Sequence, residues 1–121
     1  MKANKQQARC IQRLKERSSF LRVRQEGQYW RAPAFILQAC KNKKEGLRVG
    51  LTVTKKVSPS SVVRNRIRRR LNALACDILP LHACSDCDYV LIGRIACKDR
   101  SYALLEKDLI GCLEKLNYKK S

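Results

Sequence analysis

The stretch Val63-Arg64-Asn65-Arg66-Ile67-Arg68-Arg69-Arg70 is the most informative part of the chain, because six of its eight residues are Arg or Asn. Arginine guanidinium groups pair bidentately with phosphate oxygens, and an asparagine amide can reach sugar hydroxyls or base edges. No acidic residue lies between Glu45 and Asp77, whereas a solvated helix face usually alternates Glu with Arg. The composition therefore predicts a surface that binds a polyanion.

The same stretch carries the apolar stripe of a long helix. At about 100° per residue, one arc of the helical wheel collects Val63, Ile67, Leu71, Leu74 and Ile78. The arginines and Asn65 lie outside this arc, so we expect the stripe to pack on a sheet and the cations to face solvent. The helix is predicted to begin after Pro59, with Ser60 or Ser61 as its N-cap, and to end before Pro80.

Other elements are predicted on both sides of this helix. A short helix should start at the N-cap Ser18 and end at Gly27, with Phe20 and Val23 on one face. Strands are predicted over residues 34–40, 47–54 and 89–93, and a last helix over residues 102–116 after Ser101. Residues 1–12 are expected to form a flexible basic tail, and residues 13–121 a single domain.

The formal net charge of +17 over 121 residues is concentrated in two blocks. Residues 1–24 contain eight Lys or Arg and one acid, and residues 41–70 contain eleven and one. Residues 71–121 contain seven of each sign. Clustered positive charge of this kind is typical of nucleic-acid binding and predicts a salt-dependent affinity.

The seven cysteines and the lack of long apolar runs indicate in which cellular compartment the protein works. No run approaches the roughly 20 residues of a membrane span, and no hydrophobic signal segment follows Met1, so we expect a cytoplasmic protein with no membrane partner. An odd cysteine count argues against a disulfide framework. Cys84 and Cys87 form a Cys-x-x-Cys near His82 and are weak zinc candidates, because structural zinc usually needs two such pairs. The alternative is a loop of reduced thiols.

Residues suited to catalysis are sparse. The chain has one histidine and no Gly-rich phosphate loop, and Asp86 and Asp88 are placed in a turn before a strand. A metal-dependent nuclease normally needs several convergent carboxylates or histidines. Distant residues could still assemble in space, but no catalytic residue and no protein-held metal are predicted.

Two neighbouring segments resemble a known family. The segment Leu47-Arg48-Val49-Gly50-Leu51-Thr52-Val53-Thr54-Lys55-Lys56-Val57, followed by Val62-Val63-Arg64-Asn65-Arg66-Ile67-Arg68-Arg69-Arg70-Leu71, closely resembles the protein subunits of bacterial ribonuclease P. The resemblance extends over roughly residues 9 to 118. It implies a two-layer α/β sandwich, with helices on a mostly antiparallel central sheet of about four strands. It also implies a left-handed βαβ crossover and a likeness to a ribosomal-protein domain.

The function implied by the resemblance is that of an RNA-binding subunit in a ribonucleoprotein that removes the 5′ leader from precursor tRNA. In that family the RNA subunit carries the catalysis with magnesium, so no organic cofactor and no obligate protein partner are expected. The implied contacts to ribonuclease P RNA come from Lys55, Lys56, Arg64, Asn65, Arg66, Arg68 and Arg69. The implied contacts to the leader of precursor tRNA come from Arg13, Phe20, Arg24, Ile36 and Gln38.

Some positions depart from the family pattern. Arg24 and Gln38 replace commonly aromatic residues, and Ser58-Pro59-Ser60-Ser61 is one residue longer than the usual Gly-Asn-Ala, so the role of that asparagine is not transferred. From spacing alone, Phe20 is as well suited to a core as to a stacking site. Two alternatives remain open: a structural, ribosome-associated RNA-binding protein of similar fold, and a zinc- or thiol-regulated binding module.

Overall fold

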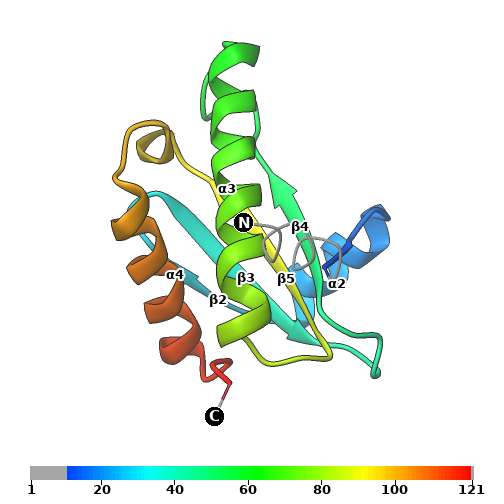
Figure 1. Cartoon of the computed structure of the whole chain (residues 1–121). Coiled ribbons are helices and arrows are strands. Elements are labelled where there is room, and N and C mark those ends of the chain that lie inside the picture. The colour runs from blue at the N-terminus through cyan, green and yellow to red at the C-terminus, as the bar shows by residue number, and fades with distance from the viewer. Residues whose placement is uncertain (1–10, 121) are drawn as a thin grey trace.

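The computed structural model describes residues 11–120, which form a five-stranded sheet with helices on it (Figure 1). In chain order the elements are β1 (Gln12–Arg13), α2 (Arg17–Glu26), β2 (Gln28–Arg31), β3 (Phe35–Lys41), β4 (Arg48–Thr52), α3 (Ser61–His82), β5 (Cys87–Gly93), the 3-10 helix η1 (Ile95–Lys98) and α4 (Tyr102–Leu116). The strand order is β1-β4-β5-β3-β2. The pairs β1–β4 and β4–β5 are parallel, and β3–β5 and β2–β3 are antiparallel.

The connection from β4 through α3 to β5 joins two parallel neighbours. In Figure 1, α3 lies in front of the sheet, both strands run upward, and the chain passes from β4 on the right to β5 on the left. A right-handed crossover, which is the rule, would pass to the right in this view. The crossover is therefore left-handed, and the predicted fold class is confirmed with one more strand than expected.

Alternation along the strands separates two apolar clusters. Phe35, Leu37 and Ala39 of β3 point into the main core beneath α3 and α4. On the opposite face, Val23 of α2 packs against Cys40 and Val90 in a second, smaller cluster. Phe20 packs against this cluster, which confirms that Phe20 and Val23 share one face of their helix.

The apolar stripe of α3 is confirmed, and the helix begins where the sequence predicts. Ile67, Leu71 and Leu74 are fully buried, and the Val63 amide donates to the Oγ of the N-cap Ser60 at 3.3 Å. The predicted end before Pro80 is wrong, because α3 continues to His82. Pro80 lies in the last turn, where Leu79 is buried and its carbonyl accepts from the Ala83 amide, so the missing proline N–H does not end the helix.

The bounds of the other predicted elements can also be compared with the structure. The strand β4 and the helix α4 lie within the predicted segments, whereas β3 extends one residue beyond its predicted end and β5 begins two residues before its predicted start. The N-cap of α2 is Glu16 rather than Ser18, because the Phe20 amide donates to the Glu16 carbonyl. No helix among the described residues is long and apolar enough to span a bilayer.

The predicted tail is too long at its C-terminal end. Ile11 is buried in the main core, and Gln12 pairs with Arg48 in the β1–β4 ladder. The Gln12 and Leu14 amides donate to carbonyls of residues 47 and 49, so backbone pairing fixes this segment. Residues 1–10, for which a tail was also predicted, lie outside the described residues.

Candidate nucleic-acid interface

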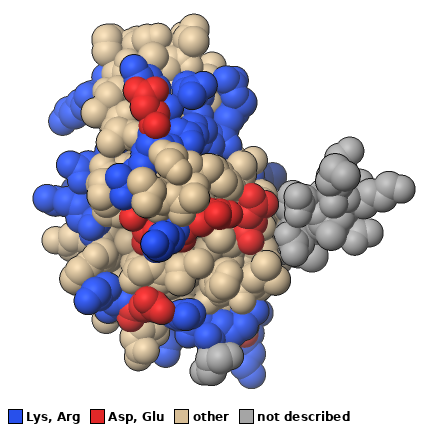
Figure 2. All heavy atoms as spheres, turned by 60° about the vertical axis from the view of Figure 1, so that its left-hand side comes forward, with Lys and Arg blue, Asp and Glu red and all other residues tan. Residues whose placement is uncertain are grey.

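The residues predicted to contact the RNA subunit lie on one continuous segment. Lys55 and Lys56 are exposed in the turn after β4, and Asn65, Arg66, Arg68 and Arg69 are exposed on the N-terminal half of α3. Figure 2 shows Lys and Arg side chains over the upper part of this face, and further ones along its left side and at the bottom, with most of the acidic side chains across the middle. We call residues 55–69 with their exposed cations the α3 face.

Intramolecular hydrogen bonds hold several arginines of the α3 face in place. The Arg64 Nη1 donates to the carbonyls of Ser58 and Pro59 at 2.9 and 3.0 Å. The Arg66 Nε donates to the Lys98 carbonyl at 3.0 Å. A guanidinium group has five N–H donors, so each side chain keeps donors for a phosphate while its position is fixed.

Arg70 has a different role from its neighbours. Its guanidinium donates to three carbonyls of η1 and the residues after it, those of Cys97, Lys98 and Arg100, at 2.8, 3.1 and 2.6 Å. The side chain is half-buried and ties this loop to α3. Sequence reasoning did not assign this role, but the signal was present, since Arg70 lies next to Val63 at the edge of the apolar arc on the helical wheel.

Arg13 and the α3 face line one hollow of about 450 Å³ beside β4. Its walls include Arg13 and Phe20 on one side and Asn65, Arg68 and Arg69 on the other. The two basic blocks of the sequence therefore meet here. Gly50 forms part of the floor, and a Cβ at this position would lie 2.5 Å from the Phe20 ring, so only glycine lets the ring lie this close to the sheet.

A second hollow, of about 400 Å³, lies between α2 and the sheet. Phe20, Arg24 and Gln38 line it, together with Leu21, Thr52, Val90 and Ile92. The structure thus brings together three of the five residues predicted for leader binding. Ile36 shares the face of Gln38 on β3 without lining the hollow, and Arg13 lines the first hollow instead. We call this second hollow the α2 cleft. Phe20 lines both hollows.

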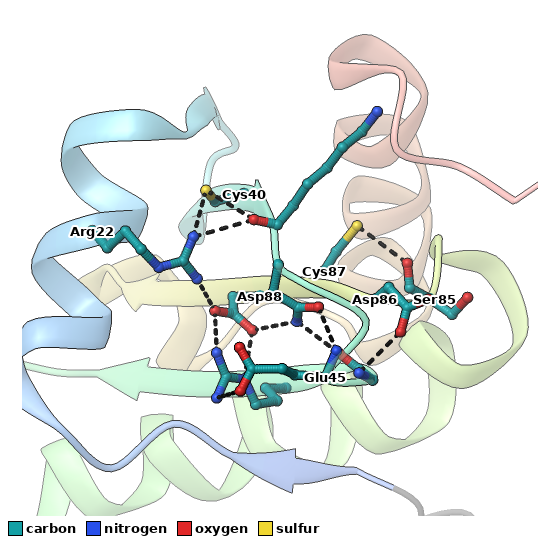
Figure 3. Close-up of polar contacts among 11 residues, drawn as sticks. Arg22, Cys40, Glu45, Ser85, Asp86, Cys87 and Asp88 are labelled. Atoms are coloured by element: carbon teal, nitrogen blue, oxygen red, sulfur yellow. Dashed lines mark hydrogen bonds and ion pairs between the residues drawn. The ribbon is translucent and has the colours of Figure 1, made fainter.

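A buried ionic cluster anchors α2 beside this cleft (Figure 3). The prediction that Asp88 lies in a turn is wrong, because it is the second residue of β5 and is fully buried. Its carboxylate accepts from Arg48 Nε and Nη2 and from Asn42 Nδ2, each at 2.8 Å, and it also pairs with Arg22 of α2. Burial alone would raise the pKa of Asp88, but the Arg48 and Asn42 hydrogen bonds and the two positive charges outweigh burial and lower it.

Cys84 and Cys87 are poorly placed to bind a zinc ion. Cys87 is buried, its thiol donates to the Ser85 carbonyl at 3.4 Å, and burial raises its pKa. The Cys84 carbonyl accepts from the Tyr89 hydroxyl at 2.8 Å. Within residues 11–120, no group of three or more His, Cys, Asp or Glu side chains is placed to hold a metal ion. The geometry gives the zinc hypothesis no support.

Comparison with known proteins finds relatives that match most of the chain. A sequence model of the family described as Ribonuclease P matches residues 9–117. The "Ribonuclease P protein component" of Paramagnetospirillum magneticum is 44% identical over an alignment of 111 residues that covers 88% of this chain and 83% of that protein. The protein of the same name from Gluconacetobacter diazotrophicus is 40% identical over 104 residues, 85% of this chain and 89% of that one.

Solved structures show the same fold. The RNase P protein of Staphylococcus aureus superposes with a TM-score of 0.73 and 25% identity, over 89% of this chain and 97% of that one. The RNase P protein of Thermotoga maritima has a TM-score of 0.70 at 22% identity, over 87% and 94%. The family match over nearly the whole length and the relatives at 40% identity or more lead to one conclusion: the chain belongs to the ribonuclease P protein family.

Proposed function

We propose that the α3 face docks on the RNA subunit of ribonuclease P and that the α2 cleft holds the 5′ leader of precursor tRNA. The observation that carries this proposal is the position of Phe20, whose side chain lines both hollows. A strand of RNA that leaves the α3 face can enter the cleft past this ring without crossing the molecule.

The chemistry of the two surfaces fits two different kinds of contact. The α3 face offers guanidinium and ammonium groups, which suit the phosphates of a folded RNA. The α2 cleft offers an aromatic ring, a guanidinium and an amide in Phe20, Arg24 and Gln38. These groups can stack on an unpaired base, stack or pair with a phosphate, and hydrogen-bond a base edge, respectively.

We further propose that the RNA subunit performs the cleavage and holds the magnesium, and that the protein works in the cytoplasm. Within residues 11–120, no group of three or more acidic, His or Cys side chains is placed to hold a metal ion, and three of the carboxylates are engaged in separate contacts. Asp88 is paired within its cluster, Asp108 accepts from Arg100 at 2.7 Å, and Asp77 accepts from the Tyr102 hydroxyl at 2.6 Å. This arrangement does not fit a magnesium site on the protein, so the role left to the protein is binding and positioning.

Reconstitution tests the proposal. The purified protein alone should cleave no precursor tRNA, and its addition to the cognate RNA subunit at low magnesium should restore removal of the leader. A folded protein that fails to rescue this activity, or that sediments with ribosomes instead, contradicts the proposal and favours the structural RNA-binding alternative.

Two variants separate the surfaces. Arg69→Ala should weaken binding of the RNA subunit, whereas Phe20→Ala should weaken binding of precursor tRNA relative to mature tRNA by about five- to tenfold. Both dissociation constants are measured for each variant at one salt concentration. Equal losses in both measurements for both variants would contradict a two-surface protein.

A further inference from the structure

The outer strand β2 presents an aromatic and a cationic side chain on the same side of the sheet as the α2 cleft. In the β2–β3 ladder, Tyr29 lies opposite Gln38 and Arg31 lies opposite Ile36. Directly opposed residues of an antiparallel pair share a face, with Cβ atoms about 5 Å apart. Tyr29 therefore stands beside Gln38 of the cleft.

The residue between them points the other way. Trp30 pairs with Leu37, whose side chain is buried in the main core, and the Lys115 Nζ of α4 lies 5.9 Å from the centre of the Trp30 ring. Strand alternation thus directs the Cβ atoms of Tyr29 and Arg31 to the α2 side and that of Trp30 to the α4 side. Arg31 also lines the hollow between β2 and α4, so it lies at the rim between the two sides.

Tyr29 and Arg31 are free to bind. Tyr29 is 63% exposed, Arg31 is exposed, and neither side chain makes a hydrogen bond or ion pair within residues 11–120. An exposed ring beside a guanidinium suits single-stranded RNA, in which a base stacks on the ring and a phosphate pairs with the cation. Arg24 adds a second exposed cation on this side, so the local charge favours a polyanion over a neutral peptide strand.

We propose that Tyr29 and Arg31 extend the α2 cleft onto β2 and bind leader nucleotides that lie farther from the cleavage site than those at Phe20. This inference rests on the proposed function. The strand order places β2 three strands from β4, about 14 Å farther from the edge where the α3 face lies, at about 4.8 Å per strand.

The test uses the reconstituted holoenzyme and precursor tRNAs whose leaders lengthen one nucleotide at a time. Tyr29→Ala should weaken binding about fivefold for long leaders and leave binding unchanged for leaders too short to reach β2. Tyr29→Phe, which keeps the ring, should behave as the wild type. Arg31→Gln should lower the salt slope for long leaders by about 0.7, the value for one lost single-strand phosphate contact.

Trp30→Ala is the matched control, because it removes a larger ring from the same strand on the opposite face. Trp30→Ala should leave the dependence of binding affinity on leader length unchanged. If Tyr29→Ala binds every leader as the wild type does while Phe20→Ala still binds weakly, the extension is wrong and the proposed cleft stands. If neither variant affects leader binding, the cleft assignment itself is wrong. Equal losses in Tyr29→Ala and Trp30→Ala would assign the effect to distortion of β2 and overturn the proposal.

Discussion

At position 88 a carboxylate lies fully buried in β5 and is held by two guanidinium groups and an amide. Nothing in the local sequence separates Asp88 from Asp86, two residues earlier, which caps the Gly46 amide at 3.0 Å in a turn. The difference arises from partners supplied by α2, by β4 and by the turn after β3, which are distant in sequence. A role of this kind cannot be predicted from spacing.

Asp88→Asn should lower the free energy of unfolding by about 3 kcal/mol, because it removes the charge that compensates Arg22 and Arg48. Urea denaturation measures the change. Asp86→Asn is the matched control. The side-chain oxygen of asparagine can still accept a hydrogen bond from the Gly46 amide, and an asparagine residue tolerates the positive φ of 56° at this position. A loss of comparable size in both variants would contradict the special role of Asp88.

The same carboxylate should make the stability of the protein depend on pH in the acidic range. The pKa of Asp88 is lower in the folded than in the unfolded chain, so its contribution is complete above the unfolded pKa of about 3.9 and disappears as the pH falls through the folded value. The free energy of unfolding should therefore fall as the pH drops below about 4. Asp88→Asn should show a shallower fall over this range in urea titrations at several pH values.

Arg69 and Arg70 are neighbours with predicted effects of opposite kind. Arg70→Ala removes three charged hydrogen bonds and should cost about 2 kcal/mol of stability. Arg69 is exposed, so Arg69→Ala should change stability by less than about 0.5 kcal/mol and instead lower the salt slope of RNA-subunit binding by about one. Denaturation and binding isotherms measured on both variants decide this. If Arg69→Ala lost stability and Arg70→Ala lost RNA affinity instead, the assignment of residues to the α3 face would be wrong.

At the level of elements, the helices with a complete apolar stripe were predictable and the short outer strands were not. The stripes of α3 and α4 repeat over several turns, which fixes the element type and the buried face, although α3 continues past its predicted end before Pro80 to His82. By contrast, β1 has two residues, and all four residues of β2 are exposed, so neither shows the alternation that marks a half-buried strand. Their pairing depends on β4 and β3, which are distant in sequence. The shape of the α2 cleft could not be predicted from local sequence patterns for the same reason, because its walls come from separate elements.

The start of α3 tests the choice that the sequence left open. Ser60→Ala should destabilise the protein by about 1 kcal/mol, because the Val63 amide loses its acceptor. Ser61→Ala should be nearly neutral, since Ser61 is the first helical residue and is exposed. Thermal denaturation compares the two. A larger loss for Ser61→Ala would move the cap by one residue.

At the scale of the whole molecule, the two basic blocks are brought together rather than kept apart. Arg13 from the first block and Arg68 and Arg69 from the second line one hollow. Like charges at this spacing repel one another in the free protein, and a net charge of +17 adds to that cost. An RNA partner relieves the repulsion when it binds, so the same charges weaken the free fold and strengthen the complex.

Salt should therefore stabilise the free protein and weaken its binding to the RNA subunit. Raising sodium chloride from about 0.05 to about 0.5 M screens surface repulsion and should raise the melting temperature of the free protein, while the buried Asp88 cluster is screened much less. Over the same range the affinity for the RNA subunit should fall steeply, because salt opposes counterion release. Arg69→Gln should show a smaller salt effect in both measurements. A melting temperature that falls with salt would mean that surface ion pairs outweigh the repulsion between the two blocks.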